Sequence, residues 1–458
     1  MKSRVVIVVG EYTHLHKAMY LAGFLVNKAK CDVTVVAEEL PKDSNYSFTI
    51  VDGVDFVDAT GWCGPEKGKI GKLLADFSSI VKNFNYFRLF YRLWKASSAD
   101  QNIVKTVMRW AQKIENVKKQ ADTLYRKKQF DVIVIAKWHS AYSPVWAVLG
   151  ERYKAPVVAF LQAATTYERL RLVTEKDNTP SSLVPLASHY LPNFVGKKYF
   201  SERRRLPLYF AHLITGLSQA TQWRHCSSSL VSAFFLESQY AFEHFKAYFE
   251  KTPVVVTGDP QYDMIAESDI PLAVRRERYF ARFGFLEELK LLVASPPKDY
   301  ISVANSDEFK TYEELLDCWL SSLKKLRNYN VLISLHPRLS EQVKSRFVRA
   351  GFAVVYMESD QWLPVCDALL VDSGTVVKLA RALGKIVVCY SICGTPHIDD
   401  GVLLAQTGAE LAECLDKIDR PELLNELSKK AYSGKNYWGE SGQSNANIWH
   451  ELSLLLRR

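Results

Sequence analysis

Short apolar runs rich in β-branched residues alternate with stretches of helical periodicity along this chain of 458 residues. Both faces of each expected strand are apolar, which is typical of a parallel sheet covered by helices on its two sides. Such alternation is built from βαβ units, so the sequence predicts an α/β fold. In the amino half the expected strands span residues 5–9, 32–39, 54–57, 131–140 and 156–164.

A second series of strands follows in the carboxyl half. The sequence also predicts helices from about His14 to Lys28, from Ser227 to Phe249, and over the last 20 residues, where apolar residues recur at helical spacing. The second series of strands spans residues 289–297, 330–338, 352–357, 367–374 and 385–390, with helices at 312–327 and 341–350 between them.

The length is too great for one ordinary core and favours two domains of roughly 200 residues each. We predict an N-terminal domain over 1–255, a C-terminal domain over 256–435 and a terminal helix over 436–458 that packs on the N-terminal domain. Two insertions, at about 67–128 and 165–206, are expected to interrupt the first domain.

The net charge of +9 is divided unevenly between the two halves. Residues 1–255 hold 35 Lys and Arg against 22 Asp and Glu, whereas the remainder holds 24 against 28. A half with a net charge of +13 is expected to meet an anionic partner, for which nucleic acid, anionic lipid and a phosphorylated acceptor all qualify.

An aromatic stripe lies in the first insertion, where Phe84, Phe87, Tyr91 and Trp94 share one helical face flanked by Arg and Lys. One interpretation is a helix that faces the core. The other is a helix that lies on anionic lipid. No apolar window reaches the 18 or so residues that a transmembrane helix needs, so any contact with a membrane is expected to be peripheral.

The cysteines are scattered, and several lie in strand-like apolar context, which favours a reducing, cytoplasmic location. Cys389, Cys393 and His397 are spaced by four residues, but no CxxC pair accompanies them. We therefore expect no metal site there.

The turn Ser373-Gly374-Thr375 follows an expected strand and opens an expected helix. Two hydroxyl groups, a glycine that admits close backbone approach and a helix N-terminus together suit a phosphate group. The alternative is an ordinary turn with capping Ser and Thr.

Polar residues also follow two neighbouring strands of the same half. His336 and Arg338 end one strand and suit a phosphate or ribose oxygen. Ser295 and Lys298 end another. Because ligands of α/β sheets bind outside the carboxyl ends of the strands, the pattern predicts a nucleotide site.

In the amino half, Glu11 and His14 follow the first strand and His139 follows the fourth. A general base for an acceptor hydroxyl would have to lie across from the nucleotide, and these three residues are our candidates. For each of them, a purely structural role is the alternative.

These motifs resemble the GT-B superfamily of glycosyltransferases. The likeness lies in the sequence VTGDPQYD at 256–263, the HPR at 336–338, and the DSGT at 372–375 before a helix. Within that superfamily, the chain is similar to bacterial transferases that build surface polysaccharides. The resemblance implies two Rossmann-like domains facing a central cleft, a C-terminal helix that crosses back, and no metal or other cofactor.

The resemblance implies transfer of a sugar from a CMP-, CDP- or UDP-linked donor to a hydroxyl of a saccharide or lipid-linked acceptor. Ser295, Lys298, His336, Arg338, Ser373, Gly374 and Thr375 would then bind the donor. UDP-N-acetylglucosamine 2-epimerases share HP and DSG motifs, but they place glutamates after the turn, where this chain has Lys378 and Leu379. The alternatives are such an epimerase, a non-catalytic nucleotide binder and a protein that binds nucleic acid; we expect no nucleic-acid partner, because that reading leaves the nucleotide motifs unexplained.

Overall fold

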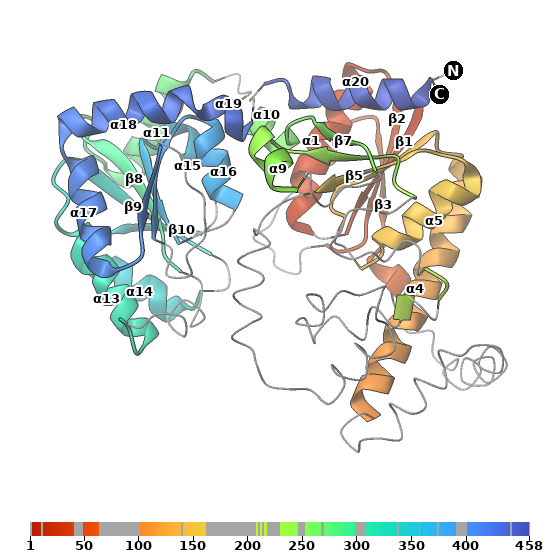
Figure 1. Cartoon of the computed structure of the whole chain (residues 1–458), viewed down its shortest axis with the longest axis horizontal. Helices are drawn as coiled ribbons and strands as arrows, with labels where there is room; N and C mark the ends of the chain where they lie inside the picture. The colour runs from red at the N-terminus through yellow and green to blue at the C-terminus, as the bar shows by residue number, and fades with distance from the viewer. Residues whose placement is uncertain are drawn as a thin grey trace.

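The structure is a computed structural model. It describes residues 2–10, 12–40, 49–63, 101–138, 141–161, 208, 211–212, 215–217, 230–245, 252–266, 270–297, 308–336, 339–356, 358–372, 375–390, 401–439 and 442–457. Within these residues the chain forms two parallel sheets of seven and six strands, each covered by helices, so the predicted α/β class is confirmed (Figure 1).

The first sheet has the strand order β3-β2-β1-β4-β5-β6-β7. Its order reverses between the two neighbours β1 and β4, whose partner residues include Val8 and Ile135. The strands are β1 (Arg4–Val9), β2 (Asp32–Ala37), β3 (Val54–Asp58), β4 (Val132–Ile135), β5 (Val157–Leu161), β6 (Ala233–Leu236) and β7 (Val254–Val256).

Alternate residues of β1 enter two separate cores. Val6 and Val8 pack with α4 (Gln101–Lys128) and α5 (Ser143–Tyr153), whereas Val5 and Ile7 pack with α1 (Leu15–Asn27). Because successive side chains of a strand point to opposite faces, an all-apolar strand requires helices on both sides. The burial of β1 explains why this short run specifies a central strand.

The second sheet has the order β10-β9-β8-β11-β12-β13, which reverses between β8 and β11. One face packs against α13 (Tyr312–Leu323) and α17 (Gly408–Asp419), and the other against α11, α15 and α16. The strands are β8 (Lys290–Ser295), β9 (Tyr329–Leu335), β10 (Ala353–Tyr356), β11 (Ala368–Val371), β12 (Ile386–Tyr390) and β13 (Val402–Ala405). The remaining helices of this half are α11 (Leu272–Phe283), α14 (Glu341–Arg349), α15 (Ser359–Val365), α16 (Thr375–Ala382) and α18 (Pro421–Ser433).

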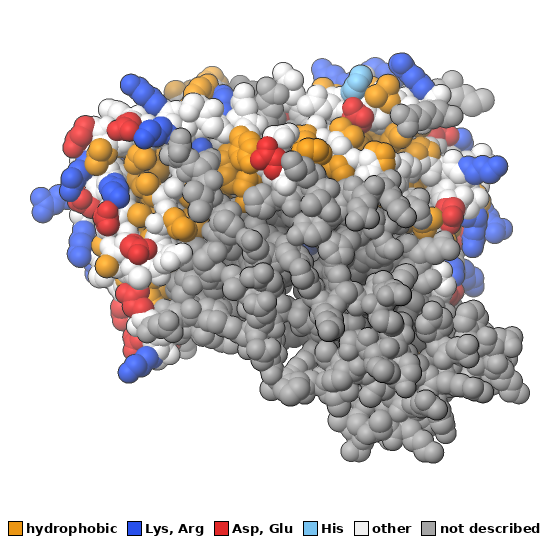
Figure 2. All heavy atoms as spheres, viewed as in Figure 1, with side chains coloured by type: hydrophobic (Ala, Val, Ile, Leu, Met, Phe, Trp, Pro, Cys, Tyr) orange, Lys and Arg blue, Asp and Glu red, His pale blue; other side chains and the backbone are white. Residues whose placement is uncertain are grey.

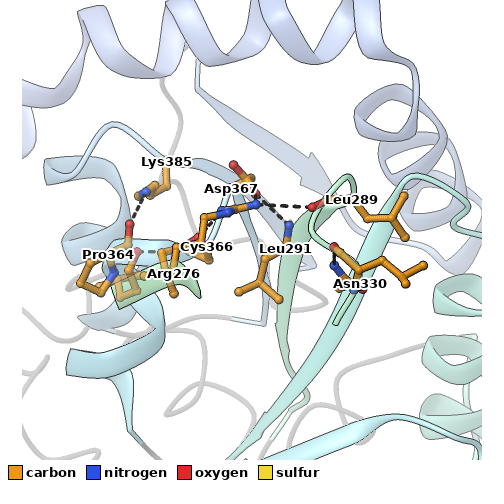
Figure 3. Close-up of polar contacts among 11 residues, drawn as sticks. Arg276, Leu289, Leu291, Asn330, Pro364, Cys366, Asp367 and Lys385 are labelled. Atoms are coloured by element: carbon orange, nitrogen blue, oxygen red, sulfur yellow. Dashed lines mark hydrogen bonds and ion pairs between the residues drawn. The ribbon is translucent and has the colours of Figure 1, made fainter. Parts of the chain in front are cut away.

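Asp367 fixes β11 against β8 at their amino ends, as Figure 3 shows. Its carboxylate accepts a hydrogen bond from the backbone N–H of Leu291 at 2.7 Å and lies 2.9 Å from the guanidinium of Arg276 on α11. The same guanidinium donates to the carbonyl of Val365 at 2.6 Å. These contacts hold the two central strands in register and therefore determine where their carboxyl ends lie.

The chain crosses between the two halves twice. Helix α9 (Gln239–Phe245) connects β6 to β7, and the chain leaves the first sheet after β7 through α10 (Pro260–Ala266). It returns through α19 (Lys435–Trp438) and α20 (Ser444–Leu456). Helix α20 lies along the half that contains the first sheet (Figure 1). Ile448 and Leu452 of α20 are buried in the core beneath α1. The predicted C-terminal helix that crosses back is confirmed.

The helix predicted from Ser227 to Phe249 is wrong. Residues 233–236 form the buried strand β6 between β5 and β7, and only the short α9 follows it. The four apolar residues of β6 cannot be distinguished from one side of a buried helix by periodicity. Strand β13 was not predicted either, because it too has only four residues and shows no clear periodicity.

The two predicted insertions lie largely outside the described residues. Residues 64–100, which include the aromatic stripe, and 165–206 are not described. Within the first insertion, residues 101–128 form α4, a helix of 28 residues that packs Val107, Ile114 and Val117 on the first sheet. This part of the chain therefore covers one face of the first domain.

Lys and Arg side chains alternate with Asp and Glu over the half that contains the second sheet, on the face that Figure 2 shows (Figure 2). Among the residues that the structure describes, none of the helices combines the length and the apolar character that a bilayer crossing requires.

Candidate functional site

The carboxyl ends of β8 and β11 mark the point where the strand order of the second sheet reverses. Ser295, the last residue of β8, pairs in register with Val371, the last residue of β11. His336 directly follows the neighbouring strand β9. Ser295 and His336 are both partly exposed. The structure therefore brings these two predicted residues to one edge of the sheet, at the position where open α/β sheets bind ligands.

Helix α16 begins at Thr375, four residues after Val371, the last residue of β11, and Asp372 directly follows that strand. Its first backbone N–H groups have no partner within the helix and carry a partial positive charge, which suits a phosphate group. The strand, turn and helix expected around the DSGT sequence are therefore present. Lys298, Arg338, Ser373 and Gly374 and the side chain of Thr375 lie outside the described residues.

Two further polar residues lie at this edge and were not predicted as site residues. Asp372 follows β11 and is 8% exposed. Tyr390 ends β12, and its buried hydroxyl has no hydrogen-bond partner among the described residues. Burial raises the pKa of Tyr390, so its hydroxyl remains a proton donor. A polar residue at the end of the run 385–390 was the signal that could have identified it.

His14 and Lys137 lie at the corresponding point of the first sheet. His14 follows β1 and directly precedes α1, and Lys137 follows β4, the strand at which the order reverses. Lys17, on the first turn of α1, places its ammonium 3.0 Å from the carboxylate of Asp259, which directly precedes α10. Glu11 and His139 lie outside the described residues. Of the three candidate bases, the structure therefore describes only His14.

The His14 imidazole is neutral at physiological pH. Burial is the largest cause, and together with the positive charges of Lys17 and Lys137 it lowers the pKa of His14 from 6.5 to about 2. A neutral imidazole can accept a proton, but one with so low a pKa is a weak base. In the unliganded protein, His14 is therefore better suited to accept a hydrogen bond than to remove a proton.

Acid should destabilise the fold through His14. The unfolded chain takes up a proton below pH 6.5, whereas the folded protein does so only near pH 2. The stability that neutral His14 provides is therefore complete above pH 6.5 and falls as the pH is lowered. Between pH 7 and pH 5 the loss should be about 2 kcal/mol.

Urea unfolding of wild type and His14→Gln at pH 7 and pH 5 would measure this loss. We expect the difference between the two pH values to shrink in His14→Gln, while His450→Gln, on the exposed side of α20, should behave as wild type does. An unchanged pH dependence in His14→Gln would contradict a neutral imidazole at this position.

Glu237 and Lys378 connect the carboxyl ends of the two sheets. Glu237 follows β6 of the first sheet, and Lys378 lies on the first turn of α16. Their charged atoms are 2.5 Å apart, and both residues are buried. The ends of the strands in the two domains therefore face each other at this contact, as the predicted central cleft requires.

No protein-family model matches the chain. No curated protein matches it in sequence. The solved structures provide the likeness. S. aureus MnaA bound to UDP is 9% identical, with a TM-score of 0.53, covering 100% of this chain and 97% of that one. The UDP-N-acetylglucosamine 2-epimerase of Neisseria meningitidis bound to UDP-GlcNAc is 12% identical, with a TM-score of 0.54, covering 99% and 100%.

Solved structures of transferases are similar to this chain over nearly its whole length as well. The structure of Phytolacca americana UGT2 with UDP-2-fluoro-glucose is 11% identical, with a TM-score of 0.56, covering 99% of both chains. The wall teichoic acid polymerase TagF with CDPG is 10% identical, with a TM-score of 0.53, covering 99% of this chain and 88% of that one. The two sheets and the returning helix thus form the GT-B fold, as the sequence motifs predicted.

Proposed function

We propose that the protein is a GT-B glycosyltransferase that moves a sugar from a CMP-, CDP- or UDP-linked donor to a hydroxyl of a saccharide or lipid-linked acceptor. One observation carries the proposal. Ser295, His336 and the start of α16 lie at the carboxyl edge of the second sheet, where its strand order reverses. Solved structures that share both domains of this fold hold UDP, UDP-2-fluoro-glucose or CDPG. Surface glycan biosynthesis is the role that we propose.

In this proposal the C-terminal domain binds the donor. Ser295, His336 and the first N–H groups of α16 would contact its phosphates, and the Asp372 carboxylate would accept hydrogen bonds from ribose hydroxyls. Lys298, Arg338, Ser373, Gly374 and Thr375 complete the proposed donor site. Catalysis would come from positioning the donor and from stabilising the departing nucleotide phosphate, without a metal.

The N-terminal domain binds the acceptor in this proposal. Its net charge of +13 supports an anionic acceptor or an anionic membrane surface that holds a lipid-linked one, at the cytoplasmic side. Glu11, His14 and His139 remain the candidate bases for the acceptor hydroxyl. The low pKa of His14 favours Glu11 or His139 for the proton transfer itself.

A thermal-shift series with CMP, CDP, UDP, GDP and ADP tests the donor site. A nucleotide that binds only the folded protein should stabilise it by about 2.7 kcal/mol at 100 times its dissociation constant. We expect CMP, CDP or UDP to raise the unfolding temperature, and His336→Ala and Ser373→Ala to reduce that increase. The matched control Ser453→Ala, on α20, should respond as wild type does.

The absence of a shift with every nucleotide at millimolar concentration would refute the donor site. Equal shifts in wild type, His336→Ala and Ser373→Ala would place the nucleotide elsewhere.

A sugar-nucleotide epimerase is the second candidate, because solved structures of UDP-N-acetylglucosamine 2-epimerases share the fold at 12% identity. Lys378 and Leu379 stand where those enzymes place glutamates, and Lys378 is held in the buried ion pair with Glu237. An epimerase would convert UDP-N-acetylglucosamine without an acceptor. Nuclear magnetic resonance of that sugar nucleotide mixed with the protein would reveal the second epimer if this candidate is correct.

A further inference from the structure

The ion pair between Glu237 and Lys378 is a buried contact between the two domains. The residues are 141 positions apart, and the Lys378 ammonium lies 2.5 Å from the Glu237 carboxylate. Lys378 is 1% exposed and Glu237 is 6% exposed. Neither charge can be hydrated while the domains remain in this arrangement, so each depends on the other.

The position of each residue relates the pair to the proposed chemistry. Lys378 is three residues beyond Thr375, about 4.5 Å along α16 from the N-terminal end that we propose for the donor phosphates. Glu237 directly follows β6 and so belongs to the carboxyl edge of the first sheet. The pair therefore connects the donor-binding end of α16 to the edge of the domain that is proposed to hold the acceptor.

A neighbouring contact between α9 and α19 is apolar and less directional. The Tyr240 ring of α9 stacks on Trp438 of α19 at 4.2 Å, and both residues belong to an apolar core that continues into the second domain. Apolar contacts supply area and tolerate small shifts, whereas a charge pair in a low-dielectric interior favours one geometry strongly. Domain placement is therefore expected to be more sensitive to Glu237 and Lys378 than to this ring contact.

We propose that Glu237 and Lys378 are positioning residues that set the orientation of the two domains and thereby align the donor with the acceptor. The alignment of donor with acceptor rests on the proposed glycosyl transfer. The domain orientation itself can be measured without any substrate. A misplacement of about 1 Å between reacting groups can lower a rate about 100-fold, so a displaced α16 would slow transfer while still binding nucleotide.

Small-angle X-ray scattering of the full chain without ligand tests the orientation. Glu237→Gln and Lys378→Met each remove one charge of the ion pair, and we expect scattering profiles that differ from that of wild type. The double variant Glu237→Lys/Lys378→Glu restores an ion pair and should restore the wild-type profile. Lys417→Met removes an exposed pair with Glu413 on α17 and serves as the control.

An apolar double variant separates positioning from stability. Glu237→Leu/Lys378→Met should recover the stability that either single variant loses, because apolar residues can replace a buried ion pair without loss. It should not recover the wild-type scattering profile, since it lacks the directional contact. A wild-type profile in this variant, or in both single variants, would overturn the proposal. Should the single variants fail to fold, the two double variants decide the matter.

Nucleotide binding distinguishes this inference from the proposed function. With UDP and CDP as probes, dissociation constants should remain within about threefold of wild type in Lys378→Met, because the donor site belongs to one domain. A loss of affinity above tenfold would show that Lys378 serves the donor site itself and would overturn the positioning role. If wild type binds neither probe, the proposed function fails, and the scattering comparison still decides the role of the pair in orientation.

Discussion

Asp263→Ala is expected to lower the free energy of unfolding by about 3 to 5 kcal/mol, one of the two largest effects predicted for this chain. Asp263, on α10, is 1% exposed and accepts three backbone hydrogen bonds. They come from the N–H groups of Gly442, Ser444 and Asn445 at 2.8, 3.0 and 2.7 Å.

The large effect of Asp263→Ala follows from the place of these donors. The N–H groups of Ser444 and Asn445 belong to the first turn of α20. Backbone N–H groups of a first turn have no partners within the helix, and a negative charge is favoured beside them. The N-cap residue Gln443 makes no side-chain capping bond. Asp263 therefore supplies the cap for the helix that returns to the N-terminal domain.

Urea unfolding, together with limited proteolysis of the segment before α20, would test this prediction. The control is Asp416→Ala on α17, whose carboxylate is exposed and pairs with Arg420 one turn away. That change should cost less than about 1 kcal/mol. A loss of similar size in Asp263→Ala would mean that α20 is held by its apolar face alone.

Lys17→Met should destabilise the protein by about 3 to 5 kcal/mol, because it removes the ammonium that lies against a buried carboxylate. The Lys17 ammonium lies 3.0 Å from Asp259, which is 5% exposed. Asp259 also accepts a hydrogen bond from the backbone N–H of Gln261 at 2.9 Å, at the start of α10. The pair thus fixes α1 against α10 near the junction of the domains.

The double variant Lys17→Met/Asp259→Asn should recover most of the stability lost in Lys17→Met. Asparagine retains an oxygen that can accept the hydrogen bond from Gln261, but it carries no charge that needs a partner. Lys417→Met, at an exposed pair on α17, should cost only about 0.5 kcal/mol in the same urea titration. If the double variant is no more stable than Lys17→Met, the penalty does not come from the unpaired charge.

The long strands of both sheets could be recognised from the sequence alone. The runs that became β1, β2, β9 and β12 are apolar on both faces, a pattern that depends only on local residues. Strand β6 could not be recognised in this way. It owes its conformation to the ladders that β5 and β7 offer on its two sides, and those neighbours are distant in the sequence.

The residues of the candidate site also differ in whether the sequence alone could identify them. Ser295 and His336 were identifiable because each follows an apolar run that had to end at a sheet edge. That β11 lies beside β8 is a property of strand order, which no local pattern encodes. Tyr390 was hidden because a tyrosine at the end of a strand reads as an apolar core residue until its buried hydroxyl is located.

The sequence by itself determined the α/β class, the returning helix and the positions of most strands, because hydrophobic periodicity and turn residues act over a few neighbouring residues. Only the tertiary structure decided which strand ends meet, that Asp263 caps α20, and that Glu237 and Lys378 pair across 141 residues. Charges that are separated so far along the chain acquire their partners only when the packed cores bring them out of water together.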